Sequence, residues 1–134
     1  MAIKIKLLRN NIKSSKNYGK YYGKAITMGE VSFEDFAKLI QKECSLKEAD
    51  VISCMKALVA AMKKELAEGR TVELEGLGRF RLSVESECVD DPKDFDVRKH
   101  IRQVIPRFLP ASHRDDGTLL YDFSEEVKVD LLVK

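Results

Sequence analysis

The chain has 134 residues, enough for one domain that buries a core without disulfide or metal staples. Apolar residues make up 44% and charged residues 34%, a balance typical of globular rather than disordered proteins. Apolar runs stay well below the ~20 residues that span a bilayer, and residues 1–9 interleave charged with apolar side chains, unlike a secretion signal. We therefore expect a cytoplasmic protein with no membrane partner.

The net charge of +2 is unevenly distributed. Residues 1–30 carry seven basic residues and one acidic residue, whereas residues 111–134 carry three basic and six acidic residues. A basic start and an acidic end point toward a polyanionic partner, and the alternative is that these lysines are plain solvated surface.

Motifs for catalysis or metal binding are not apparent in the sequence. The three cysteines (Cys44, Cys54 and Cys88) contain no C-x-x-C pair, so we expect buried reduced thiols rather than a zinc or redox site. The histidines, His100 and His113, have no neighbours at metal or triad spacing, and the acidic run near residue 90 lacks the glycine and glutamate of a calcium loop. We predict no enzyme activity, no cofactor and no small-molecule substrate.

The first thirty residues predict two short strands. Ile3, Ile5 and Leu7 alternate with other residues at the period of a half-buried strand, and residues 21–27 form a second strand-like piece before a turn at Gly29. Residues 10–17 are polar and predict the loop between them.

Two helices are expected next. Ser32 precedes Asp35 by three positions, as in a capping box, and apolar residues follow at helical spacing. Ser45 and Glu48 suggest a second capping box that opens a longer helix, which ends at Gly69 as a left-handed cap. That longer helix has two apolar rows, and the short helix can cover only one. A second copy of the chain or the sheet covers the other, and the pattern does not decide between them.

The rest of the chain predicts strands. Residues 71–75 and 80–84 alternate on either side of a glycine-containing turn, and residues 101–109 form a returning strand. Between them, Asp91-Pro92 predicts one or two helical turns running to about His100. In the tail, a turn at residues 115–117 precedes an alternating edge strand at residues 126–131.

Two motifs in this order resemble the HU and integration-host-factor family of bacterial histone-like DNA-binding proteins. Residues 66–80, LAEGRTVELEGLGRF, are similar to the family's stretch through its GFG-x-F turn, and residues 105–110, IPRFLP, are similar to its VPAFKP strand. The 24 residues between them (81–104) are close to the length of the family's β-arm. The basic, tyrosine-containing start resembles a longer HU-related branch with an N-terminal extension.

The resemblance implies an α+β fold in which two helices are followed by an antiparallel sheet with a β-arm, in an intertwined dimer. It implies three regions: a basic N-terminal extension with short strands (residues 1–30), an HU-like DNA-binding domain (31–110) and an acidic tail with an edge strand (111–134). The implied function is architectural, largely sequence-independent binding of double-stranded DNA in the nucleoid, by a homodimer with a basic saddle.

The implied DNA contacts are basic side chains on the saddle. Arg79 and Arg81 project to one side of a strand because strands alternate with period two. The predicted set comprises Arg79, Arg81, Arg98, Lys99, Arg102 and Arg107, with Lys13, Lys16, Lys20 and Lys24 as auxiliary phosphate contacts. For each residue taken singly, the alternative is solvated surface.

The predicted arm departs from the family. Its end is acidic, with Glu87, Asp90, Asp91, Asp94 and Asp96 opposed by Lys93 alone. The family's DNA-wedging proline role is therefore not transferred to Pro92, and we expect the arm to fold back as a short helix with Phe95 and Val97 packed inward. This departure leaves a second interpretation open, a dimeric protein-interaction module on an HU-like scaffold with weak or lost DNA binding.

Overall fold

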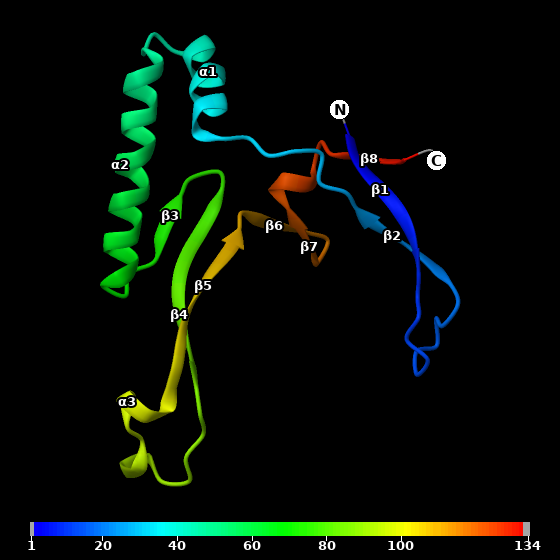
Figure 1. Cartoon of the computed structure of the whole chain (residues 1–134), viewed down its shortest axis with the longest axis vertical. Coiled ribbons are helices and arrows are strands. Elements are labelled where there is room, and N and C mark those ends of the chain that lie inside the picture. Colours follow the sequence, from blue (N-terminus) through cyan, green and yellow to red (C-terminus); the bar gives the residue numbers. More distant parts are fainter. Residues whose placement is uncertain (1, 133–134) are drawn as a thin grey trace.

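The computed structural model describes residues 2–132 and has a mixed α+β fold (Figure 1). In chain order its elements are β1 (Ala2–Arg9), β2 (Tyr21–Ala25), α1 (Phe33–Glu43), α2 (Glu48–Ala67), β3 (Val72–Leu74), β4 (Gly78–Ser86), η1 (Pro92–Asp94), α3 (Val97–His100), β5 (Ile101–Pro110), β6 (Ser112–Asp115), β7 (Thr118–Tyr121), η2 (Asp122–Ser124) and β8 (Lys128–Leu131). No helix within residues 2–132 is both long and apolar enough to cross a membrane.

Local caps set the limits of the two long helices. The Asp35 amide donates to Ser32 Oγ at 3.2 Å and the Ser32 amide donates to Asp35 Oδ2 at 3.1 Å, so the first predicted capping box is confirmed. The hydrogen bond donated by the Ser32 amide also lowers the pKa of the Asp35 carboxyl. At the other end of the pair, Gly69 adopts φ +86° after α2 and ends it as predicted.

The second predicted capping box is wrong. α2 begins at Glu48 with Lys47 in the capping position, and no side chain caps the helix. Ser45 lies two residues before that position, outside the place from which a hydroxyl satisfies the first free amides of a helix.

The central sheet has the order β3-β4-β5 and is antiparallel. Phe80 lies opposite Phe108 in the register, and their rings stack with centroids 4.7 Å apart. Leu82 and Pro106 form the next pair on the same apolar face. The other face therefore carries the residues between them, and β4 and β5 continue together into a long arm (Figure 1).

A second sheet joins the two ends of the chain. β1 pairs antiparallel with β2 and parallel with β8, in the order β2-β1-β8, so the predicted edge strand in the tail is confirmed. The β6–β7 hairpin (residues 112–121), here called the tail hairpin, was not anticipated. Its turn at Asp116 and Gly117 was predicted, and both residues have positive φ, as a tight hairpin turn requires.

A single copy of the chain has almost no closed core. Among the described residues only Ala37 and Val51 are buried hydrophobic side chains, while Leu39, Leu58 and Phe108 are 54%, 47% and 42% exposed. The expectation of buried thiols is wrong for the single copy, because the three cysteines are exposed. The apolar sides of α1 and α2 have no second surface to cover them here, and Cys88 lies beyond the end of β4.

Candidate nucleic-acid interface

Three arginines share one face of the β4–β5 ribbon. Arg81 lies directly opposite Arg107, and Arg79 precedes Arg81 by two residues on the same side. We call this set, Arg79, Arg81 and Arg107, the arginine face. It lies on the side of the sheet opposite Phe80 and Phe108, because neighbouring residues of a strand point to opposite faces.

Gly78 makes this placement possible at the start of β4. Its φ is +149°, and a β-carbon there would lie 2.3 Å from the Leu109 carbonyl oxygen. Only glycine allows the two strands to approach this closely at this backbone conformation. In the register that follows from Gly78, Arg79 lies beside Leu109 and Arg81 beside Arg107.

The arginine face is incompletely neutralised by the protein. Arg79 approaches Glu73 at 3.7 Å, and Arg107 Nε donates to Ser83 Oγ at 3.4 Å. Arg81 forms no ion pair within residues 2–132. Like charges directly opposite in a sheet are destabilising. An anion bound between Arg81 and Arg107 would relieve that repulsion.

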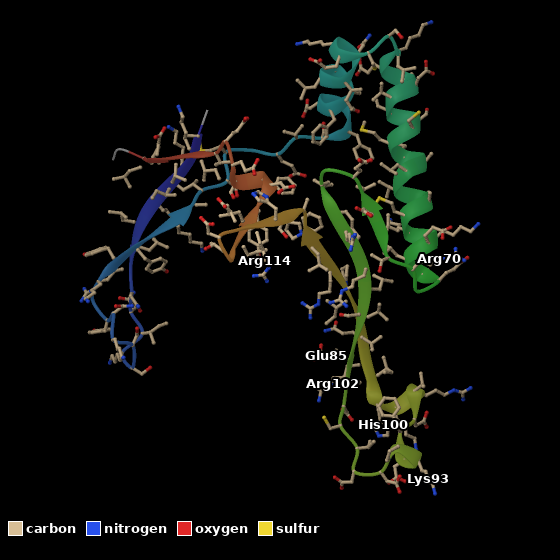
Figure 2. The ribbon with its side chains drawn as sticks, turned by 180° about the vertical axis from the view of Figure 1, so that it is seen from behind. Arg70, Glu85, Lys93, His100, Arg102 and Arg114 are labelled. Carbon is tan, nitrogen blue, oxygen red and sulfur yellow. The ribbon has the colours of Figure 1, made fainter. Side chains whose placement is uncertain are left out.

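Arg102 belongs to a different environment. The register shifts there, with Glu85 opposite Gln103 and Ser86 opposite Ile101, so Arg102 is the extra residue of a β-bulge. Its guanidinium lies 3.6 Å from Glu85 and 3.5 Å from Glu87. Two carboxylates therefore neutralise the charge that sequence reasoning assigned to DNA, halfway along the arm (Figure 2).

Arg98 and Lys99 lie still farther from the arginine face, in α3 at the end of the arm (Figure 1). Both are exposed. The four basic residues predicted to contact DNA from residues 98–107 therefore lie in three places. Arg107 is on the arginine face, Arg102 is at the bulge, and Arg98 and Lys99 are in the arm tip (residues 87–100).

The arm tip folds back as predicted, and two of its acids have local structural roles. Asp91 accepts from the Lys93 amide at 3.0 Å and Asp96 accepts from the Arg98 amide at 2.9 Å, each capping a helical turn. The Asp96 amide in turn donates to His100 Nδ1 at 2.8 Å. Part of the acidity that departs from the family thus serves to fold the tip.

Of the two apolar side chains expected to pack inward, Phe95 is only partly covered, at 37% exposed, and Val97 is not covered. Phe95 packs against His100, with ring centroids 5.3 Å apart. Val97 is 69% exposed, so its predicted inward packing is wrong. α3 has only four residues and cannot cover Val97. The surface of Phe95 that could have packed against Val97 is in contact with the His100 ring instead.

The N-terminal lysines form a separate basic group. Lys13, Lys16 and Lys20 lie in the loop between β1 and β2, and Lys24 lies in β2 opposite Lys6. The loop is closed by the Asn10 amide, which donates to the Lys20 carbonyl at 2.8 Å. In Figure 1 this loop extends from the β2-β1-β8 sheet and lies apart from the arm and the central sheet.

Sequence reasoning missed the side chains of the tail hairpin. His113 Nδ1 lies 2.8 Å from Asp122 Oδ1, and Nε2 lies 3.3 Å from Glu125 Oε1. The hydrogen bond with Asp122 raises the pKa of His113. The same three residues could each offer a metal ligand. Each ring nitrogen already faces a carboxylate, so His113 forms a clamp that joins the hairpin to η2 and is strongest when the imidazole is protonated.

The profile of one family, described as an HU domain fused to a wHTH, Ig or glycine-rich motif, matches residues 1–114. The chain belongs to this HU-HIG family. The HU-like resemblance seen in the sequence is thereby confirmed, and the HU-HIG match also covers the N-terminal strands. No curated protein matches the chain.

A solved structure has the same fold as this HU-HIG chain. It is a candidate bacterial DNA-binding protein from Bacteroides vulgatus ATCC 8482, with a TM-score of 0.67 and 14% sequence identity. The likeness covers 98% of this chain and 48% of that one, so the present chain spans about half the length of its relative. At this identity the likeness concerns the fold alone.

Proposed function

We propose that the protein binds double-stranded DNA as an architectural, largely sequence-independent nucleoid component, without catalysis, cofactor or small-molecule substrate. The observation that carries the proposal is the facing pair Arg81 and Arg107, with Arg79 beside it. Membership of a family defined by its HU domain supports it, as does the DNA-binding description of the structurally similar protein.

The arginine face suits the DNA backbone rather than base edges. Guanidinium groups form paired hydrogen bonds with phosphate oxygens, and their attraction to phosphate is independent of base sequence. Three arginines per copy correspond to about six phosphate contacts per dimer, so the logarithm of the binding constant should fall with the logarithm of salt at a slope of about −5.

A homodimer is part of the proposal because a single copy leaves its apolar faces open. Phe36 on α1, Leu58 on α2 and Leu82 on β4 are 44%, 47% and 38% exposed. Exposed apolar surface of this extent marks an association site, and a second copy supplies matching surface through two-fold symmetry. The dimer would present two arginine faces to one duplex.

The remaining predicted contacts take secondary roles. We propose residues 31–110 as the DNA-binding domain and residues 1–30 as an extension whose loop lysines add phosphate contacts, with residues 111–134 as a separate acidic tail. Arg98 and Lys99 would meet DNA only if the arm reaches it. We also propose that the chain belongs to an extended HU-related branch and acts in the cytoplasm.

The neutralised bulge favours a second candidate function. Arg102 is held by Glu85 and Glu87, and the arm tip keeps Asp90 and Asp94 as further acids. An arm of this charge could recognise a protein in place of DNA, on the same dimeric scaffold. The two functions differ in whether the arginine face binds a duplex.

A duplex titration at two salt concentrations, with intact and nicked DNA of random sequence, tests the proposal. The double variant Arg79→Glu with Arg81→Glu should lose most of the affinity and flatten the salt slope, while size-exclusion chromatography with light scattering still finds a dimer. The variant Lys38→Glu with Lys42→Glu makes the same charge change on α1 and should bind like the wild type. Wild-type protein that binds no duplex at low salt would favour the protein-interaction function.

A further inference from the structure

The tail hairpin is fixed to the end of the central sheet by several contacts. The Ala111 amide donates to the Leu77 carbonyl at 3.0 Å, and the Asp122 amide donates to the Ala111 carbonyl at 2.9 Å. Phe123 packs edge-on against Phe108, with centroids 6.4 Å apart. The hairpin is therefore held against the end of the central sheet at both of its strand ends.

One side of the tail hairpin and the arginine-bearing side of the sheet line the same cleft. Pairing of Ser112 with Tyr121 and of Arg114 with Leu119 puts these four residues on one face of the hairpin. The cleft has a volume of about 510 Å³, and its walls include Glu73, Arg79, Leu109, Ser112, Leu119 and Tyr121. Arg114 thus shares a hairpin face with three residues of the cleft wall. Figure 2 shows Arg114 on this hairpin, away from the arm tip.

The strand alternation separates the charges of the tail. His113 and Asp115 belong to the opposite hairpin face, and His113 holds Asp122 and Glu125 there. Asp130 pairs with Lys4 at 3.2 Å in the terminal sheet. Arg114 is exposed, forms no ion pair within the described residues, and contacts the Gly117 carbonyl of its own turn at 3.4 Å.

We infer that Arg114 binds the phosphate backbone of the same DNA, so that the tail hairpin forms a second phosphate-binding wall across the cleft from Arg79. This inference rests on the proposed function and extends its site beyond the HU-like domain. Three of the acids of residues 111–134 are already bound by basic groups: His113 holds Asp122 and Glu125 on the opposite hairpin face, and Lys4 pairs with Asp130 in the terminal sheet. The tail then widens the footprint on DNA beyond the saddle.

Salt-dependent duplex titration of variants of the 134-residue chain tests the inference. Arg114→Gln should reduce the magnitude of the salt slope by about 0.9 per copy, or about 2 per dimer, and weaken binding about eightfold at 0.1 M salt for each phosphate that is no longer neutralised. Arg114→Lys should keep the wild-type slope, because the interaction with phosphate needs the positive charge. Lys128→Gln, which removes the same charge from the same tail, should also keep it.

The outcomes separate this inference from the proposed function. Suppose that Arg114→Gln shows the same salt slope as Lys128→Gln, while Arg79→Glu with Arg81→Glu still weakens binding. DNA binding by the arginine face is then retained as the proposal, and phosphate binding by Arg114 is refuted. The inference is also overturned if Arg114→Lys reduces the salt slope as much as Arg114→Gln does. Wild-type protein that fails to bind duplex would overturn both proposals together.

Discussion

Replacing Glu85 and Glu87 with glutamine should strengthen DNA binding. Both carboxylates face Arg102, at 3.6 and 3.5 Å, and the three side chains are between 41% and 58% exposed. Glutamine keeps the size and the carbonyl oxygen of glutamate, so Gln103, which donates to Glu85 at 2.8 Å, keeps an acceptor. The change therefore removes the charge from the bulge with little change in shape.

The cost to stability should be small and the gain in binding measurable. Charges about 3.5 Å apart in water attract by about 1.2 kcal/mol, and exposed pairs contribute only about 0.2–1 kcal/mol each after side-chain entropy is included. Because these side chains are exposed, solvent screens both ion pairs, and each contributes near the lower limit of that range. If Arg102 then reaches phosphate in each copy, the salt slope becomes steeper by about 2 per dimer.

Duplex titration across a salt series, with thermal unfolding of the same samples, measures both quantities. The variant Glu30→Gln with Glu43→Gln removes the same charge away from the arm and serves as the control. An unfolding midpoint within a few degrees of wild type and a steeper slope in the arm variant alone are expected. Slopes equal to wild type in a protein that binds DNA would show that the arm does not reach the duplex at Arg102.

Two further predictions concern the supports of the site. Gly78→Ala should lower stability by more than about 1 kcal/mol, since a β-carbon collides with the Leu109 carbonyl at positive φ, and denaturant unfolding measures the loss. The raised pKa of His113, due first to Asp122, implies that its clamp stabilises the tail fully below the ordinary value of 6.5 and is lost as pH rises through the folded pKa. Hydrogen exchange of the tail hairpin should therefore accelerate toward alkaline pH beyond the intrinsic rate, and His113→Gln should abolish that excess.

The parts of the fold that depend on neighbouring residues could be predicted from the sequence. Ser32 and Asp35 interact across three residues, and the strand alternation around Phe80 repeats every two, so neither needs distant information. Ser45 shows the limit of such reasoning. Ser45 and Glu48 have the spacing of a capping box, but the N-cap position of α2 is Lys47, two residues after Ser45. The Ser45 hydroxyl therefore does not cap the helix.

The candidate site depended on information that local patterns do not contain. Alternation predicts that Arg79 and Arg81 share a face, but the pairing of Arg81 with Arg107 requires the register across the whole arm. Alternation from Arg107 alone would put Arg102 on the opposite side of β5. The register contains a bulge at Arg102, however, and its guanidinium lies 3.6 Å from Glu85, which shares its side of β4 with Arg79 and Arg81. Counting basic residues along the returning limb could not reveal this change.

Net charge was least informative for the tail. Its acids outnumber its basic residues two to one, which favours exclusion from DNA when the segment is treated as one charge. A hairpin does not present its charges together, because alternate residues point to opposite sides. His113 holds Asp122 and Glu125 on one side, and Arg114 lies on the other with the residues of the cleft wall. What a DNA phosphate meets at this hairpin is therefore decided by the face it approaches, and an acidic segment can still supply a cationic contact.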